Sequence, residues 1–317
     1  MLIVAALGGN ALLRRGEPLT YVNQQRNIEI ACDALAPLAR EHRLVLTHGN
    51  GPQVGLLALE DEAYGGFPLD VLDAETEGMI GYALERGLRS RMPGRAISTL
   101  LTQVRVSPRD PAFLAPSKPV GPVYTAPQAD RARREHGWTL APDGTGFRRV
   151  VASPRPLEIL GLDGIRELLG AGSIVICGGG GGIPVAAERD GTLRGVEAVI
   201  DKDLLASLLA ERLGADLLLI LTDVGEVVRD WGTPRARPIE TTTPSRLRRL
   251  DFAAGSMGPK VEAVCRFVER TDRRAVIGAL EDASTLPERG GTRVMPAARR
   301  TRRRGGAPAP PRPRSRR

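Results

Sequence analysis

The chain has 317 residues and a formal net charge of +8, but residues 296–317 alone hold nine Arg and no acid, so subtracting +9 from +8 leaves residues 1–295 at −1. A near-neutral body argues against a basic nucleic-acid-binding fold, and no apolar run reaches the roughly 20 residues of a membrane span. The three cysteines lie 145 and 88 residues apart, which argues against a disulfide framework and a thiolate zinc site and predicts a reducing, cytoplasmic location.

Short apolar runs alternate with longer amphipathic ones, which is typical of a mainly parallel sheet covered by helices. No basic segment precedes the first apolar run, so the N-terminus predicts a strand and not a signal peptide. Strands are predicted at Leu2–Leu7, Arg43–Thr47, Ala96–Thr102, Ser173–Cys177, Asp216–Thr222 and Ala275–Ala279. Helices are predicted at Gln24–Arg40, Gln53–Glu62, Leu72–Arg91, Leu162–Ala171, Lys202–Leu213 and Pro259–Thr271.

Two segments interrupt this rhythm. The segment 107–150 begins with six prolines between residues 108 and 127 and continues with an Arg-rich stretch, so it is too long for a plain connection and predicts a small inserted lobe. Either the lobe is a lid over a site or it is a surface excursion. Residues 296–317 contain mainly Pro, Gly, Ala and Arg, so we expect a disordered tail after a single folded domain spanning 1–295.

Glycine-rich turns follow three of the predicted strands, at Gly8–Asn10, His48–Gly51 and Gly178–Gly182. The carboxyl ends of parallel strands form the ligand crevice of an open sheet, and glycine lets backbone N–H groups approach an anion there. A single such turn is more simply explained by the need for a tight bend, but three together predict a phosphate or carboxylate site. The P-loop pattern is absent, and Gly49–Gly55 misses the dinucleotide fingerprint by one residue.

Only three of the 45 basic residues are lysines, namely Lys118, Lys202 and Lys260. Each lies beside a glycine-rich segment or a helix start, where a compact ammonium can follow a migrating phosphoryl group better than a guanidinium can. The alternative is that three lysines fall near turns by chance. With no Ser/His/Asp order nearby, the lysines favour phosphoryl transfer, in which positioning and charge neutralisation supply most of the catalysis.

Other polar residues near these turns leave two interpretations open. Asp203 could orient ammonium groups, and Asp201 could instead cap the helix. His48 either contacts substrate or is a packed histidine, and three scattered histidines cannot form a three-histidine metal site.

Cys177 ends a buried strand and is predicted to be inert core. Pro259 is expected at the first position of its helix.

Nine segments, in order along the chain, resemble the motifs of the carbamate kinase family. They are Ala6–Ala11, His48–Gly55, Pro68–Asp70, Leu101–Gln103, Ser117–Pro122, Cys177–Pro184, Gly195–Asp203, Ile220–Val224 and Gly255–Lys260. The match as a whole runs in order from Met1 to about Val294 and covers nearly the whole folded body. The resemblance implies the amino-acid-kinase fold, an α/β/α sandwich on a mainly parallel eight-stranded sheet with a small protruding subdomain.

The same resemblance implies an activity and its residues. The reaction would be reversible phosphoryl transfer between ATP and carbamate with Mg²⁺, run by a homodimer and often toward ATP in arginine catabolism. Residues for the carbamoyl phosphate end would be Gly9, Asn10, Gly49, Asn50 and Gly51. Lys118 and Lys202 would neutralise the transferring group and Asp203 would organise the lysines. Thr222, Asp223 and Lys260 would lie on the nucleotide side.

The chain departs from the family pattern in places. It has five glycines before Ile183-Pro184, where the family usually has four, and the basic tail has no counterpart. A sister kinase of the same fold, acting on a larger carboxylate, is a second hypothesis. A third is non-specific nucleic-acid binding through the tail, which would weaken with salt and lacks aromatic residues for base stacking.

Overall fold

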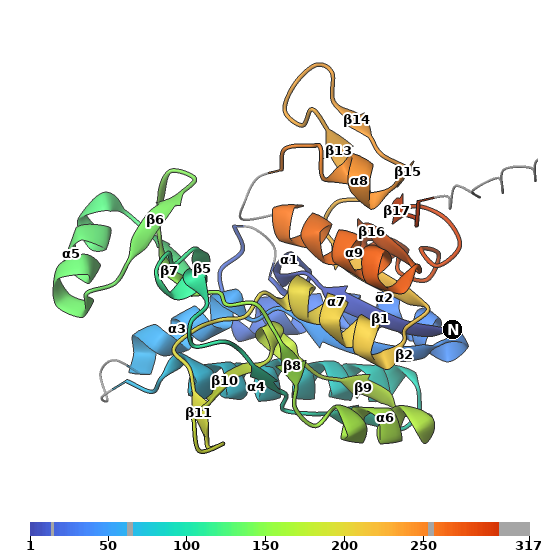
Figure 1. The fold of residues 1–317 in the computed structure, drawn as a ribbon, viewed down its shortest axis with the longest axis horizontal. Coiled ribbons are helices and arrows are strands. Elements are labelled where there is room, and N and C mark those ends of the chain that lie inside the picture. Colours follow the sequence, from blue (N-terminus) through green and yellow to red (C-terminus); the bar gives the residue numbers. More distant parts are fainter. Residues whose placement is uncertain (14–15, 62–65, 253–256, 298–317) are drawn as a thin grey trace, which may run out of the picture.

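The computed structural model of the chain describes residues 1–13, 16–61, 66–252 and 257–297. Its centre is an eight-stranded sheet of order β15-β17-β16-β12-β1-β2-β9-β3 (Figure 1), in which every pairing except β16–β17 is parallel. Its strands are β1 (Leu2–Leu7), β2 (Arg43–His48), β3 (Ile97–Thr99), β9 (Ile174–Ile176), β12 (Leu217–Thr222), β15 (Thr241–Thr242), β16 (Arg274–Ala279) and β17 (Thr292–Val294). The predicted sheet is confirmed.

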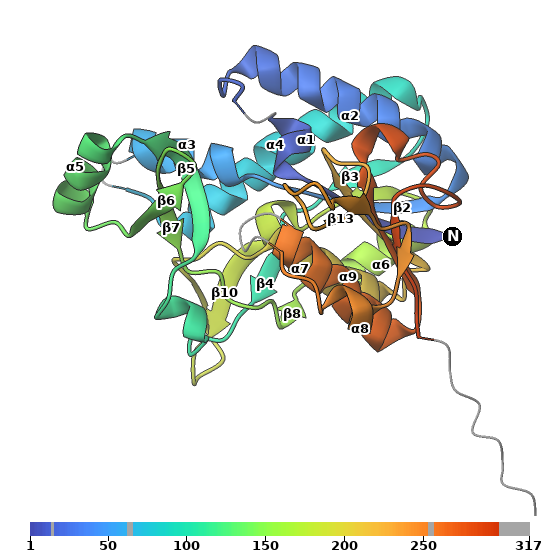
Figure 2. The same ribbon diagram turned by 90° about the horizontal axis from the view of Figure 1, so that it is seen from above.

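Helices cover both faces of this sheet (Figure 2). On one side lie α2 (Tyr21–Glu41) and α4 (Leu69–Arg91), and on the other lie α6 (Leu162–Gly170), α7 (Lys202–Leu213) and α9 (Met257–Thr271). Successive side chains of β1 enter opposite cores, with Leu2, Val4 and Ala6 packing on the α7–α9 side and Ile3, Ala5 and Leu7 on the α2–α4 side. Because both of its faces are buried, β1 is continuously apolar.

Most predicted boundaries are close to the observed ones, and the shifts have local causes. Helix α2 begins three residues earlier than predicted because the Thr20 hydroxyl caps it, accepting from the backbone N–H of Asn23 at 3.3 Å. Strand β3 ends at Thr99, and the chain then crosses to a second sheet. Pro259 is the third residue of α9 and not the first, a position where the missing N–H still costs no helical hydrogen bond.

A small lobe protrudes from the sandwich at the left of Figure 1. It consists of β5 (Lys118–Tyr124), α5 (Ala126–His136), β6 (Leu140–Asp143) and β7 (Gly146–Val151), with its antiparallel strands in the order β5-β7-β6. The lobe rests on α3 (Gly51–Asp61), where a Cβ added at Gly55 would lie 1.9 Å from the backbone nitrogen of Gly121. Only glycine permits this backbone approach.

The remaining elements are short. A four-stranded sheet of order β11-β10-β4-β8 underlies the lobe's root, and β13 pairs with β14. These elements are β4 (Gln103–Arg105), β8 (Glu158–Ile159), β10 (Ile183–Ala187), β11 (Leu193–Gly195), β13 (Val228–Arg229), β14 (Arg237–Pro238), α1 (Gly9–Leu12), α8 (Pro244–Leu247), η2 (Pro111–Phe113), η3 (Gly179–Gly181) and η4 (Leu280–Asp282). Within the described ranges no helix has the length and apolarity needed to cross a bilayer. From residue 298 on, the predicted tail lies outside the described residues.

Candidate functional site

The three glycine turns follow β1, β2 and β9, which are direct neighbours in the sheet. Two of the turns touch: a Cβ added at Gly49 would lie 3.2 Å from the Cα and the backbone nitrogen of Gly9. It would also lie 3.7 Å from Cε of Lys202, so the start of α7 reaches the same place. The structure therefore brings the first two predicted turns and one predicted lysine together at the carboxyl edge of the sheet.

All three lysines meet at two aspartates that begin α7. The ammonium of Lys118 donates to Asp201 Oδ2 at 2.6 Å, and that of Lys260 donates to Asp203 Oδ2 at 3.2 Å. Lys202 donates to the other oxygen, Oδ1, of Asp203. These lysines come from β5, α7 and α9, which are distant in sequence. Their convergence leaves one positive charge in excess beside the glycine turns, an arrangement suited to a phosphoryl group.

Burial and charge set the ionisation of this cluster. Asp203 is 3% exposed, and burial alone would raise its pKa, but the ammonium groups of Lys202 and Lys260 hold that pKa well below its usual value. Burial lowers the pKa of Lys202, which is 8% exposed, against the opposing effect of Asp203. Burial acts the same way on Lys118, but Asp201 outweighs it and the pKa of Lys118 is raised.

Asp201 also caps α7, so the capping interpretation is confirmed. Its Oδ1 accepts from the backbone N–H groups of Asp203 at 2.9 Å and Leu204 at 3.2 Å. The ion pair with Lys118 uses the other oxygen. Asp201 therefore both caps α7 and pairs with a lysine, two roles that the sequence suggested separately for Asp201 and Asp203.

The predicted nucleotide-side residues lie next to the first glycine turn. Strand β12 ends at Thr222, whose hydroxyl donates to Asp223 Oδ1 at 2.9 Å. A Cβ added at Gly8 would lie 3.6 Å from the Cα of Thr222, so the end of β12 and the turn after β1 are in contact. The third nucleotide-side residue, Lys260, belongs to the lysine cluster through its bond to Asp203.

Asn50 and Gly51 begin α3, where the carbonyl of Asn50 accepts the first helical bond from Val54 at 2.9 Å. The amide of Asn50, however, is used inside the protein: Nδ2 donates to Asp73 Oδ1 at 2.8 Å and to Thr76 Oγ1 at 2.9 Å. Asn50 is 2% exposed, so its side chain supports the His48–Gly51 turn from inside the protein. The side chain of Asn10 lies outside the described part of the structure.

The third glycine turn differs from the prediction. Gly178 donates its N–H to Thr102 Oγ1 at 2.9 Å, and Gly179 donates to Glu77 Oε1 at 2.7 Å. The N–H groups of Gly181 and Gly182 donate to carbonyls within the turn at 3.2 and 2.9 Å. A Cβ added at any of the five glycines from Gly178 to Gly182 would lie within 2.6 Å of other protein atoms. The expectation that this turn cradles an anion is therefore wrong for these four N–H groups, because close packing is what requires glycine here.

Two buried acids on α4 support this turn, Glu77 directly and Asp73 through Asn50, and sequence analysis missed both. Glu77 accepts the N–H groups of Gly179 and of Thr102, the latter at 3.0 Å, while Asp73 accepts from Asn50. Burial raises the pKa of Glu77 to about 8 and raises that of Asp73 well above its usual value. Asp73 Oδ2 is buried without a hydrogen-bond partner among the described residues. The signal that could have found the pair is two acids four residues apart on the apolar face of a predicted helix.

His48 and Cys177 belong to the interior. His48 is fully buried, and burial lowers its pKa to about 4, so it is a neutral packed histidine. Cys177 is 1% exposed, and burial raises its pKa, which confirms an inert core thiol. The described residues contain no cluster of three or more His, Cys, Asp or Glu that could hold a metal ion.

The chain is similar to known proteins over more than nine tenths of its length. Residues 1–279 match the model of the amino acid kinase family. The chain is 54% identical to a carbamate kinase of Rhizobium meliloti, over 92% of each chain, and 51% identical to one of Haemophilus influenzae, over 93% of this chain and 96% of the relative. A solved carbamate kinase from Giardia lamblia bound to AMP-PNP is 39% identical, with a TM-score of 0.85 over 93% of this chain and 98% of that one.

Proposed function

The chain belongs to the amino acid kinase family and, within it, to the carbamate kinases, so it transfers a phosphoryl group between ATP and carbamate, and on that premise we propose how its residues divide the work. Lys118 and Lys202 neutralise charge on the transferring group, and Asp203 orients Lys202 and Lys260. The turn residues Gly9, Asn10, Gly49, Asn50 and Gly51 hold the carbamoyl phosphate end. Thr222, Asp223 and Lys260 lie on the nucleotide side.

The observation that carries these assignments is the convergence of three lysines on two aspartates beside the first two glycine turns. In the direction of ATP consumption, a carbamate oxygen forms a bond to the γ-phosphorus while the bond from that phosphorus to the β,γ-bridging oxygen breaks. ADP leaves, and no net proton is transferred in this step. The protein's task is to hold the two substrates in line and offset the negative charge, which the ammonium groups do.

The two turns would bind the carbamoyl phosphate end of the substrate through backbone groups. Gly9 has open space on its Cβ side, because a Cβ added there would meet no protein atom within 4 Å. A Cβ added at Gly51 would have only the carbonyl oxygen of Pro119 nearby, at 4.0 Å. The N-terminus of α3 adds its partial positive charge at the same place. For Asn50 the contact assigned is its backbone, since its amide is used internally.

The nucleotide assignment draws support from the Giardia relative, whose structure holds AMP-PNP. Mg²⁺ would provide charge neutralisation between the phosphates when the nucleotide is bound. In the described part of the chain both oxygens of Asp203 already bond lysines and no acidic cluster is formed, so these residues offer no carboxylate set for a protein-held metal. We place the enzyme in the cytoplasm, making ATP from carbamoyl phosphate in arginine catabolism.

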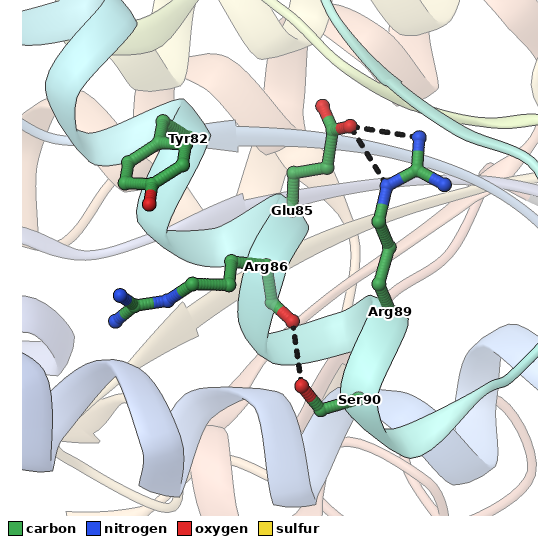
Figure 3. Close-up of a pocket in the computed structure, with 5 residues that line it drawn as sticks. All are labelled: Tyr82, Glu85, Arg86, Arg89 and Ser90. Carbon is green, nitrogen blue, oxygen red and sulfur yellow. Dashed lines mark hydrogen bonds and ion pairs between the residues drawn. The ribbon is translucent and has the colours of Figure 1, made fainter.

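A homodimer is proposed through the outward face of α4 and the edge strand β3. Met79, Tyr82 and Leu101 are 43%, 62% and 60% exposed there. Figure 3 shows the pocket on this face, about 450 Å³ in volume, with Tyr82 and Arg86 extending from the same side of the helix. Light scattering of the wild type and of Tyr82→Asp tests this: a dimer that becomes a monomer supports the face, and a monomeric wild type contradicts it.

The experiment for the substrate assignment is ATP formation from ADP and carbamoyl phosphate, with a buffer blank. Gly9→Ala adds a methyl group into open space, so we expect an unchanged melting temperature and an at least roughly tenfold loss of kcat/KM for carbamoyl phosphate. Gly164→Ala on α6 is the matched control, since it too meets nothing within 4 Å, and its activity should be normal. Wild-type activity no higher than the blank would instead favour a sister kinase acting on a larger carboxylate.

A further inference from the structure

The segment that enters α7 contacts the lobe at every second residue. Glu197 pairs with Arg149 of β7 at 3.5 Å, and the N–H of Val199 donates to the carbonyl of Ala152, just after β7, at 3.0 Å. Asp201 then pairs with Lys118, the first residue of β5. The lobe therefore joins the sandwich through residues 197, 199 and 201, immediately before the turn of helix that carries Lys202 and Asp203.

Asp201 is the more buried of the two acids in this segment that pair with the lobe, and its partner is a lysine. It is 7% exposed, and its side chain uses one oxygen for the cap of α7 and the other for the Lys118 ammonium. Capping by itself does not need a buried charge, because a neutral Asn or Ser caps a helix equally well. A carboxylate next to a phosphoryl site also repels the phosphorylated substrate, unless a cation pairs with that carboxylate. Capping therefore does not explain why the second oxygen of Asp201 carries charge here.

We propose that Asp201 is a positioning residue that holds the Lys118 ammonium at the transferring phosphoryl group and ties the root of the lobe to the start of α7. The inference rests on the role proposed for Lys118. A lysine on a four-carbon stem has many rotamers, and its ammonium is useful only where charge develops. Because the Lys118 side chain is 28% exposed, the fold alone confines it incompletely, and the bond to Asp201 selects one position.

Asp201→Asn separates the two roles, since Asn keeps the capping oxygen and the volume but loses the charge that attracts the ammonium. We expect a melting temperature close to that of the wild type, a fall of about tenfold in kcat for ATP formation, and little change in KM for ADP. The carboxylates that face Lys118 are Asp201, Asp203 and Asp73. Removing the nearest lowers the pKa of Lys118, so the alkaline limb of the kcat–pH profile should move to lower pH.

Glu197→Gln is the matched control, because it weakens the other ion pair between this segment and the lobe, and Glu197 is 57% exposed. Its kcat and pH profile should equal those of the wild type. The double variant Asp201→Asn/Lys118→Met should be no slower than Lys118→Met alone if Asp201 acts through Lys118.

Two results would overturn the proposal: an Asp201→Asn enzyme with unchanged kcat and alkaline limb, or a loss of similar size in the Lys118→Met background. If Lys118→Met itself keeps full activity, the role assigned to Lys118 fails instead. The two failures are thus distinguishable.

Discussion

Two pairs of buried acids lie on opposite sides of the glycine turns and have opposite chemistry. Asp201 and Asp203, at the start of α7, face three ammonium groups. Asp73 and Glu77, on α4, face the amide of Asn50 and the backbone N–H groups of Thr102 and Gly179. Neighbouring ammonium groups lower the pKa of Asp203, whereas burial raises the pKa of Glu77 to about 8 and also raises that of Asp73.

The difference separates catalysis from support. In the proposed mechanism, the charged pair and its lysines face the transferring phosphoryl group. The second pair fixes the turn after β9 and the Asn50 side chain, which is one layer below that surface. Changes to the first pair should therefore reduce turnover at nearly constant stability, and changes to the second should reduce stability first.

The largest expected effect is that of Lys202→Arg on turnover. Lys202 is 8% exposed, its ammonium is bonded to Asp203, and its Cε lies under the glycine turns. A planar guanidinium keeps the charge but cannot occupy the same point, so we expect kcat for ATP formation to fall by about 10²–10³. Arg194→Lys on exposed β11 is the control and should retain wild-type kcat. Near-normal turnover of Lys202→Arg would contradict the role assigned to Lys202.

Next in size is the effect of Gly180→Ala on stability. Gly180 has φ +68°, and a Cβ there would lie 2.2 Å from Nδ2 of Asn50, displacing its bonds to Asp73 and Thr76. The strained backbone and the lost bonds should lower the free energy of unfolding by about 3 kcal/mol. Gly191→Ala is matched in backbone, with φ +87° and no atom within 4 Å, and should cost about 1 kcal/mol. Equal losses in urea melts would contradict the packing explanation.

The pH dependence of stability should show whether Asp73 and Glu77 are protonated in the folded protein. Between the ordinary pKa of 4.5 and the folded pKa of about 8, Glu77 is protonated in the fold and ionised in the unfolded chain. The stability that this difference contributes is complete below pH 4.5 and is lost as the pH rises through 8, and Asp73 acts in the same direction. Each group adds a slope of at most about 1.4 kcal/mol per pH unit.

Urea unfolding of the wild type and of Asp73→Asn, between pH 5 and pH 9, measures this slope. Asn resembles the neutral acid and does not titrate, so the variant should lose less stability toward alkaline pH. Asp251→Asn changes an exposed acid and should leave the slope unchanged. If Asp73→Asn loses as much stability from pH 5 to pH 9 as the wild type does, the raised pKa assigned to Asp73 is wrong.

Local patterns were enough to predict the charged pair and much of the fold. Strand β1 and helix α7 have the predicted bounds, because apolar period and an aspartate cap are properties of neighbouring residues. The lysines were recognisable because the chain uses Arg almost everywhere else. The resemblance to carbamate kinases then assigned their roles, and the structure shows that they meet.

The second pair could not be found in this way. Glu77 and Gly179 are 102 residues apart, and no local pattern relates them. A run of glycines has the same sequence whether it cradles an anion or packs against side chains, and only the surroundings of Gly178–Gly182 decide between these. Here a histidine, an asparagine and a glutamate already occupy that space.

The smallest effect, and the most direct test of the glycine turn, is that of Thr102→Val. Thr102 is 3% exposed, and its hydroxyl accepts the N–H of Gly178 at 2.9 Å while donating to the carbonyl of Leu100 at 3.1 Å. Val has the same shape without the hydroxyl, so the buried N–H loses its acceptor at a cost of about 1–2 kcal/mol in unfolding free energy. Thr285→Val removes an exposed hydroxyl bond to Asp282 and should change stability by less than about 0.5 kcal/mol.

If the turn only supports the site, KM for carbamoyl phosphate stays within about twofold of the wild type. An increase of tenfold or more without loss of stability would mean that this turn touches the substrate, and the division between a catalytic and a supporting acid pair would have to be abandoned.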